Sequence, residues 1–589
     1  MGLKNYIIKY NSDNSNITMS KAAEINSPID IFTRDANWKI SFALGALIGA
    51  IIFIAIYGIK VLDVTYDDWL MRYEFDLTQH YLGWRLYRNS GWHFPLGLCD
   101  TSIYPYYSSI VYTDSIPLFA FIFKILAPVL PSRFQYFGLF GIICFMLQGG
   151  MSKLLLRKYI KNEWICNIGA VFFVSNIVFV QRMFWQTALS AHFLILMAMA
   201  LFVYRDDIES LRKRVILWSV LGALSVSIHF YLYGMVSVML AGFALWEAIE
   251  EGKKAGKILT AIKTFALFLL PYLILSVATF FVFGGFYGTV KSVEDSTALY
   301  NASINSLFRS MGNSLFFPNG EHGDMELEGF GYVGVAVGLL LIPAIISLII
   351  NIKTLWKEKR GLFILTTVLS VFFYLFSLSP VIAFSGKYLF SINIFPSLIT
   401  KISWGLFRAC GRFLWPVMYL LILVAISYSE KILKKAYPIV LVIMMCLQIV
   451  EFSGYYKKTF ETFDSFEYLP CPADVFDQYD MSQYMHIQFM QNFKWFDYYS
   501  SLECYYEFVG YARLATDKGM TISNFHFARD YDKVAQEQID KSLEKLNSGK
   551  PDKDTLYVFP KEFYIQNGYQ GKFENVMEFD TGYDIVLIP

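Results

Sequence analysis

The chain has 589 residues, of which 55% are hydrophobic and only 17% are charged, and its mean hydropathy is +0.42. This composition excludes an ordinary soluble domain and is typical of a protein that crosses a membrane several times. A net charge of +1 at pH 7 provides no overall field that would attract a nucleic acid. The cysteines stand in no spacing typical of a metal site.

The N-terminal segment, residues 1–38, is mostly polar and precedes a first apolar run at 40–62. That run is too long for the apolar region of a cleavable signal peptide, and it is long enough to cross a bilayer. We therefore expect a cytoplasmic segment followed by an uncleaved first transmembrane helix.

A polar patch follows this run, and residues 76–97 read DLTQHYLGWRLYRNSGWHFPLG. If the stretch is helical, Asp76, His80, Trp84 and Arg88 lie on one face. An acid, an imidazole, an aromatic ring and a guanidinium at a membrane surface suit a phosphorylated or sugar-bearing substrate on a lipid. The carboxylate can act there as a general base on an acceptor hydroxyl, or it can cap a helix or pair with Arg88.

Residues 115–130 are apolar but short, and they contain Lys124. A full span here would place the basic residues near 157 outside the membrane. We therefore predict an interfacial or re-entrant helix on the outer face. Asp114 stands just before it, either as a plain helix cap or as a second carboxylate that holds a metal or an acceptor.

Including the first, about eleven apolar runs predict membrane spans, and the linkers between them alternate in charge. Every second linker carries clustered Lys and Arg, as at 157–161 and 353–360. The positive-inside rule places these linkers in the cytoplasm, and it places the others and everything after about 454 outside. The predicted spans lie near 40–62, 134–155, 163–181, 187–203, 215–231, 232–247, 263–283, 331–351, 362–380, 414–428 and 437–453.

This topology places a set of acids, arginines and histidines, from Asp76 to Arg412, at or near the outer surface and leaves the cores of the spans nearly free of charge. Ion-coupled transporters usually need charges at mid-depth, so the distribution favours chemistry at the outer face. Arg408 and Arg412, in the segment WGLFRACGRFLWP, are four residues apart on that side. Two guanidiniums on one helix face suit a phosphate or pyrophosphate, although contacts with lipid headgroups would explain them equally well.

Two further outer groups are candidates for the substrate site. Glu328 forms an acidic cluster with Asp324 and Glu326, which could hold Mg²⁺ or Mn²⁺ or could be a solvated loop. Gln186 lies at a tight outer turn next to Arg182.

The tail, residues 454–589, is polar and predicts a small α/β domain. Cys471 and Cys504 lie in it and could form a disulfide outside the cell. Strands are expected at 485–491, 520–523, 556–559 and 583–588, and helices at 501–517 and 529–547.

Five segments in order resemble an uncharacterised family of bacterial multi-pass membrane proteins usually grouped with the GT-C glycosyltransferases: DLTQHYLGW, YTDSIPL, FQYFGLF with LQG, ELEGFGYVG and FRACGRFLWP. The topology, with an acid in the first external loop, also resembles that of aminoarabinose and mannosyl transferases. The resemblance implies a polyprenyl-phosphate sugar donor, with Asp76 in the position of the loop acid. The chain has Ser-Ile-Pro where those relatives have Lys-Pro-Pro or His-Pro-Pro, and it lacks their paired acidic dipeptide.

Together these observations predict an all-α polytopic, GT-C-like domain at 39–453, with its first external loop at 63–133, and an extracytoplasmic α/β domain at 454–589. We expect an inverting glycosyltransferase of the bacterial plasma membrane that moves a sugar from polyprenyl phosphate to a cell-envelope glycan or lipid. The alternatives are a lipid-linked glycan flippase and a non-enzymatic envelope assembly protein. The expected site residues are Asp76 and His80 for catalysis, Arg408, Arg412 and Arg88 for the donor phosphate, and Asp114, Trp84, Trp92, Glu328 and Gln186 for the substrate.

Overall fold

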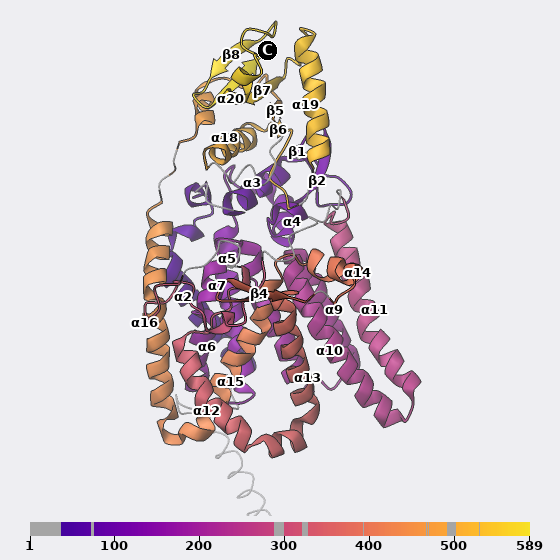
Figure 1. Ribbon diagram of the computed structural model, residues 1–589, viewed down its shortest axis with the longest axis vertical. Coiled ribbons are helices and arrows are strands. Elements are labelled where there is room, and N and C mark those ends of the chain that lie inside the picture. The colour runs from indigo at the N-terminus through magenta and orange to yellow at the C-terminus, as the bar shows by residue number, and fades with distance from the viewer. Residues whose placement is uncertain are drawn as a thin grey trace, which may run out of the picture.

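The protein is mostly helical, and a small sheet domain stands at one end of its helical bundle (Figure 1). The predicted cytoplasmic segment at 1–38 lies almost wholly outside the described residues. The computed structural model describes residues 37–71, 76–287, 300–320, 328–392, 394–466, 468, 470–491, 502–528 and 531–589.

The apolar runs of the sequence form the helices of the bundle, because a helix satisfies its own backbone hydrogen bonds where no water is at hand. Each predicted run overlaps with a helix. These helices are α2 (Trp38–Tyr57), α5 (Phe137–Arg157), α6 (Glu163–Val174), α8 (Phe193–Val203), α9 (Leu211–Ile228), α10 (Phe230–Ala255), α11 (Ile258–Val282), α12 (Val335–Ile350), α13 (Ile352–Leu378), α15 (Trp415–Leu433) and α16 (Tyr437–Asp464).

Six segments of the described chain are long and apolar enough to cross a membrane. Five are α2, α5, α10, α11 and α13, and the sixth, Cys410–Asp464, contains both α15 and α16. Three shorter apolar helices lie at Glu163–Val174, Thr187–Val203 and Val335–Ile350. The chain thus has the helices of a membrane protein, whereas the prediction of about eleven spans goes beyond the six that length and apolarity identify.

Helices α2 and α5 approach each other so closely that glycine is required at the contact. A Cβ atom at Gly45 would lie 2.4 Å from the backbone oxygen of Gly149, and one at Gly49 would lie 2.0 Å from that of Phe145. Small residues allow membrane helices to pack in this way.

Between α2 and α5 the chain forms a substructure of short elements, which contains α3 (Asp76–Asn89), a hairpin of β1 (Leu98–Ile103) and β2 (Tyr106–Ser109), and α4 (Pro117–Ile125). The proline at the start of α4 stands where a helix needs no N–H donor. A short helix was predicted at 115–130 and is present. Its nine residues are too few to cross a bilayer.

The C-terminal domain is a five-stranded sheet with the strand order β6-β5-β7-β9-β8. Strands β5, β6 and β7 are parallel, and β9 is antiparallel to both of its neighbours. The predicted strands and helices are found near their expected places, and β8 is an additional, mostly exposed edge strand. The elements are β5 (His486–Phe489), α18 (Leu502–Lys518), β6 (Thr521–Ile522), α19 (Asp532–Asn547), β7 (Thr555–Pro560), α20 (Lys561–Gln566), β8 (Met577–Asp580) and β9 (Asp584–Ile588).

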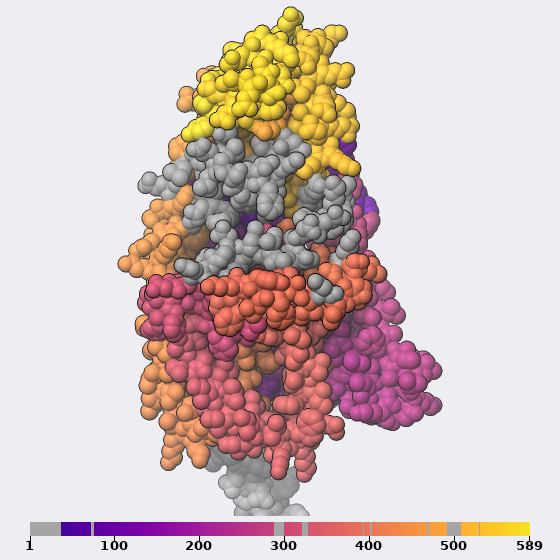
Figure 2. Space-filling view, in the orientation of Figure 1, coloured from indigo at the N-terminus to yellow at the C-terminus, as the bar shows by residue number. Residues whose placement is uncertain are grey.

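Ionic and backbone contacts fix the C-terminal domain on the substructure around α3. Asp517 of α18 pairs with Arg85 of α3 at 2.7 Å and with Arg133 at 3.1 Å. The backbone N–H of Tyr104, between β1 and β2, donates to the carbonyl of Ile522 at 2.9 Å. Figure 2 shows this domain as the upper end of the molecule, and the turns α12–α13 and α15–α16 lie at the lower end in Figure 1.

The remaining elements are short. They are α7 (Ile177–Arg182), the hairpin of β3 (Val381–Phe384) and β4 (Lys387–Ser391), and α14 (Ser397–Thr400).

Candidate functional site

Asp76 is the first residue of α3, where the partial positive charge of the helix N-terminus favours a carboxylate. Its Oδ2 accepts a hydrogen bond at 3.1 Å from the side-chain amide of Gln186. Gln186 follows α7, so a residue from the middle of the chain meets the acid of the first loop. This contact begins the site.

The Gln186 amide joins groups from four segments of the chain. Its Oε1 accepts from Arg182 at 2.8 Å and from Arg412 at 3.0 Å, and its Nε2 donates to Asp76 and, at 3.2 Å, to Glu328. A primary amide has two donor hydrogens and two acceptor lone pairs, and all four are used here. We call these residues the Asp76 cluster: Asp76, Arg182, Gln186, Glu328 and Arg412.

The two acids of the cluster are in opposite electrostatic situations. Glu328 pairs with Arg412 at 2.6 Å and with Arg182 at 3.3 Å. Burial alone would raise the pKa of Glu328, but the two guanidiniums outweigh it and hold that pKa far below its usual value. Burial raises the pKa of Asp76, and His526 and Gln186 offset this only in part. Glu328 is thus a fixed counter-ion, whereas Asp76 can exchange a proton.

A small cavity of about 20 Å³ opens beside the cluster. Its walls include His80, one helical turn beyond Asp76, and His229, whose Nε2 lies 3.7 Å from Asp114 Oδ1. Burial lowers the pKa of His80 to about 3, so this imidazole is neutral near pH 7. The lining residues are His80, Asp114, Gln186, Ala188, Leu189, His229 and Arg412.

The C-terminal domain reaches into the same region. The side-chain amide of Gln79 donates to the backbone carbonyl of His526 at 2.7 Å, and the N–H of Ala528 donates to the carbonyl of Tyr112 at 2.8 Å. Burial lowers the pKa of His526 to about 4, although the charge of Asp76 opposes the shift. The site is therefore shared between the bundle, the first-loop substructure and the C-terminal domain.

The structure brings together most of the residues that the sequence singled out, and six predicted residues line the cavity or join its cluster. They are Asp76, His80, Asp114, Gln186, Glu328 and Arg412.

The sequence predicted that Arg408 and Arg412 share one helix face, but in the structure they do not. Residues Cys410–Leu414 form a 3-10 helix, and Arg408 lies in the bend before it. The guanidinium of Arg412 stacks on Tyr231 at 4.5 Å, and that of Arg408 lies over Tyr300 at 5.2 Å. Arg412 alone of the two joins the cluster.

The prediction for Arg88 needs correction, because its guanidinium closes the turn after α4 rather than lining the cavity. It donates to the carbonyls of Ala127, Leu130, Pro131 and Ser132 at distances from 2.6 to 3.2 Å. Four carbonyl oxygens accept hydrogen bonds from the guanidinium and hold it in place as a cap of that turn.

The two tryptophans predicted to bind the substrate also lie away from the cavity. The buried indole of Trp84 donates to the carbonyl of Phe134 at 3.1 Å. Trp92 is 54% exposed and packs beside the ammonium of Lys124, 4.9 Å from its ring. Both rings stabilise the first-loop substructure.

Of the acidic cluster suggested as a metal site or a solvated loop, only Glu328 lies within the described residues, and Asp324 and Glu326 lie outside them. Glu328 pairs with two arginines. Within the described ranges, no group of three or more His, Cys, Asp or Glu side chains is placed to hold a metal ion. Cys471 is buried next to Asp474, and the side chain of Cys504, its suggested disulfide partner, is outside the described part.

Sequence reasoning undervalued Arg182 and His229 and did not identify His526 as part of the site. The spacing of Arg182 and Gln186, one helical turn, is a signal that the sequence does carry. His526 belongs to the tail, and no local pattern connects a lone histidine there with an acid 450 residues earlier.

Comparisons with known proteins match two parts of the chain and assign no activity to it. Residues 46–453 match the family described as a domain of unknown function (DUF6311), and residues 480–582 match the DUF6311 C-terminal domain. No curated protein and no solved structure matches the chain. The first match contains the whole Asp76 cluster, and the second contains His526.

Proposed function

Since the chain belongs to the DUF6311 family, whose description gives no function, we propose one from its site: a membrane glycosyltransferase of the GT-C type. It transfers a sugar from a polyprenyl phosphate to a hydroxyl of a cell-envelope acceptor on the external face. One observation carries the proposal, namely that a single amide holds a carboxylate of raised pKa next to two buried guanidiniums.

The proposed reaction is a single displacement. Asp76 accepts the proton of the acceptor hydroxyl while the hydroxyl oxygen forms a bond to the anomeric carbon of the sugar. The bond from that carbon to the phosphate oxygen breaks, and its electron pair leaves with the phosphate. Arg412, supported by Arg182, stabilises the charge that develops on the leaving group. Attack from the face opposite the leaving group inverts the anomeric centre.

The electrostatics assign the two acids to different tasks. A general base is most effective when its pKa approaches the working pH, so the raised pKa of Asp76 suits the role. Glu328 has a strongly lowered pKa and its oxygens face guanidiniums, which makes it a poor base. In the proposal, Glu328 instead holds the two guanidiniums in position to bind the donor phosphate.

Substrate binding must open the site. A cavity of about 20 Å³ holds little more than one water molecule. In the proposal, the donor phosphate replaces Glu328 as the anionic partner of Arg412. Neutral His80 forms part of the pocket for the reacting hydroxyl. Arg408 is close in sequence and provides a second cation at the entrance.

The proposed topology has eleven spans, formed by the helices listed for the bundle, with the Lys- and Arg-rich turns in the cytoplasm. Three of these turns, α10–α11, α12–α13 and α15–α16, lie at the end of the bundle away from the C-terminal domain (Figure 1). The positive-inside rule then makes the Asp76 end external. Nucleotide sugars are not expected there, so a lipid-linked donor fits.

The test is a transfer assay in membranes that contain the protein and a labelled polyprenyl-phosphate sugar. Asp76→Asn keeps the size of the side chain and removes the base, so we expect transfer to fall by about 10²–10⁴-fold. The matched control is Asp68→Asn, an acid of the same loop that is not part of the Asp76 cluster. Full transfer by Asp76→Asn at normal expression would refute the assignment, and so would an equal loss in both variants.

A further inference from the structure

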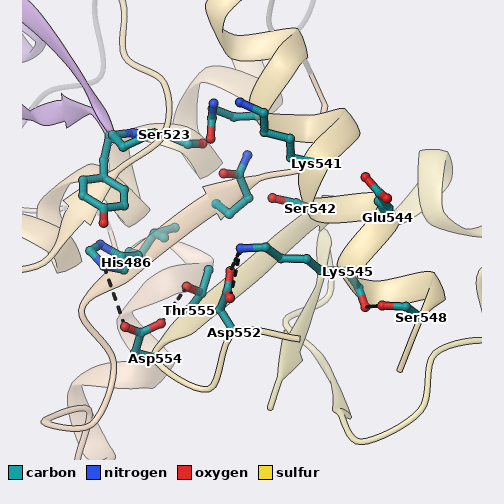
Figure 3. A pocket seen from close by; sticks show the side chains of 15 residues that line it. His486, Ser523, Lys541, Ser542, Glu544, Lys545, Ser548, Asp552, Asp554 and Thr555 are labelled. Atoms are coloured by element: carbon teal, nitrogen blue, oxygen red, sulfur yellow. Dashed lines mark hydrogen bonds and ion pairs between the residues drawn. The ribbon is translucent and has the colours of Figure 1, made fainter. Parts of the chain in front are cut away.

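A second and much larger cavity, of about 640 Å³, lies between α19 and the sheet of the C-terminal domain (Figure 3). The turn between β1 and β2 forms one of its edges, through Tyr104 and Pro105. We call it the groove. Its volume is in the range of pockets that hold ligands.

One face of α19 supplies a row of polar side chains to the groove. Gln538, Lys541, Ser542 and Lys545 recur at the three- and four-residue steps that place side chains on one side of a helix, and Ser548 follows directly after α19. In Figure 3, Lys541, Ser542 and Lys545 stand opposite His486 and Thr555, which come from the strands. A ligand in the groove would therefore meet hydroxyls and amides on both sides.

Both lysines of the groove have acidic partners within the protein. Lys545 pairs with Asp552 at 2.7 Å, and Lys541 pairs with Glu537 at 2.6 Å. Two further acids, Glu544 and Asp554, line the groove, and burial lowers the pKa of His486, which lies 3.8 Å from Asp554. With its lysines paired and further acids in its lining, the groove offers little attraction to an anionic ligand. The groove thus favours a neutral, hydroxyl-rich ligand over a phosphate or a nucleic acid.

Two features of the groove are suited to a sugar. The ring of Tyr104 is 40% exposed and is held flat on the His486 ring, with centroids 4.0 Å apart and planes 13° apart. Gln538 is only 9% exposed, yet within the described part of the chain nothing accepts a hydrogen bond from its Nε2. A buried donor without an acceptor is costly, and a ligand hydroxyl in the groove would relieve that cost.

The groove is connected with the Asp76 cluster through one short segment. Ser523 lines the groove, and His526, three residues later, binds Gln79 of α3 and lies close enough to affect the pKa of Asp76. Three residues span at most about 10 Å. A ligand that extends along this segment can occupy the groove with one part and reach the carboxylate with another.

We propose that the groove binds the acceptor, and that the acceptor is an oligosaccharide or polysaccharide of several neutral sugars rather than a lipid. Sugars distant from the reacting end rest in the groove, between α19 and the Tyr104–His486 pair. The terminal hydroxyl then extends along residues 523–526 to Asp76. This inference rests on the proposed function for its acceptor role, whereas saccharide binding in the groove is tested by itself.

The experiment measures binding to the full-length protein in detergent, without any donor. The probes are neutral oligosaccharides released from the cell envelope of the organism that makes the protein and separated by size. Gln538→Leu removes the unpaired amide at similar volume, and Gln536→Leu is the matched control on the exposed side of the same helix. We expect fragments of several sugars to bind and Gln538→Leu to weaken binding about tenfold, the loss of roughly one hydrogen bond. We expect Gln536→Leu to bind as the wild type does.

A second pair of variants separates this inference from the proposed function. Tyr104→Ala removes the ring platform and should weaken binding, whereas Asp76→Asn should bind the same oligosaccharides normally although it has lost transfer. Undiminished binding in both Gln538→Leu and Tyr104→Ala, or no binding of any oligosaccharide to the wild type, overturns the inference. Saccharide binding in the groove together with full transfer by Asp76→Asn overturns the proposed function and leaves the groove as a saccharide site.

Discussion

The two cavities of this protein are built on opposite principles. The Asp76 cluster encloses a space for about one water molecule among charged side chains, whereas the groove offers about 640 Å³ among polar groups whose lysines are paired with acids. A closed, charged site strengthens electrostatic effects on a reacting atom, because little solvent screens them. An open, polar surface is better suited to binding an extended ligand. In the proposed function, chemistry and recognition therefore occupy separate parts of the chain.

Under the proposed function, the firm attachment of the C-terminal domain would serve the alignment of the two cavities. Asp517 holds Arg85 and Arg133 of the first-loop substructure, and Arg513 binds Asp517 at 3.3 Å on the same helix. A recognition domain that presents a ligand to a distant carboxylate must keep its orientation, since misplacement by about 1 Å can cost 10²-fold in rate.

The largest expected effect in the charged region comes from Glu328→Gln. The change leaves Arg182 and Arg412 buried without the carboxylate that they share. We expect the free energy of unfolding to fall by about 3–5 kcal/mol, the cost of breaking a buried ion pair from one side. Denaturant unfolding in detergent, followed by tryptophan fluorescence, measures this change.

The control for Glu328→Gln is Glu251→Gln, which breaks an exposed pair with Lys254 and should cost about 0.5 kcal/mol or less. Equal effects of the two variants would contradict the buried network. The pKa of Glu328 is lowered in the folded protein, so its contribution to stability is complete above the ordinary glutamate pKa of about 4.3 and is lost as the pH falls further.

A smaller effect is expected from Gln186→Leu, which keeps the volume of the side chain and removes its four hydrogen bonds. Gln186 positions Asp76 and the arginines, so we expect transfer to fall by about 10²-fold, mainly in kcat. Its hydrogen bond also lowers the pKa of Asp76, and the variant should therefore raise that pKa further.

The pH profile of transfer separates this positioning role from a merely structural one. In the wild type, kcat/KM should be lost on acidification at a pH above the ordinary aspartate pKa of about 3.9, because the base is protonated as the pH falls through its raised pKa. In Gln186→Leu this acidic limb of the profile should move to higher pH. In the control Gln181→Leu, a glutamine of α7 shortly before Gln186, it should stay in place. An unmoved limb in Gln186→Leu would show that the amide does not tune Asp76.

The sequence was sufficient to predict the helices and the core of the site. The apolar runs have no stable alternative to helix in a membrane, so their positions were readable. The predicted topology placed Asp76, Gln186, Glu328 and Arg412 on the same side of the bundle, and the structure brings these four residues together. That grouping depends on the order of the spans and not on their exact number, and length and apolarity identify six.

The prediction that Trp84 and Arg88 join Asp76 in one site, because they share a face of α3, failed for a geometric reason. Trp84 and Arg88 do follow Asp76 at steps of four residues, but Trp84 lies about 12 Å and Arg88 about 18 Å further along the helix axis. The helix is also buried on nearly all sides, so a shared face does not mean a shared neighbourhood. His526 was not predictable, because its place depends on how the C-terminal domain docks on α3.

The smallest expected effect concerns salt, and it tests the neutral character of the groove directly. Exposed charges are screened beyond a Debye length of about 10 Å at 0.1 M salt and about 3 Å at 1 M salt. If the ion pairs of Lys541 and Lys545 only stabilise the groove and do not contact the ligand, the affinity for a neutral oligosaccharide should change less than about twofold between these salt concentrations. A charged ligand would lose much more. A steep decline of binding with salt would therefore show that the groove recognises an anion through its lysines, and the contrast between the two cavities would no longer hold.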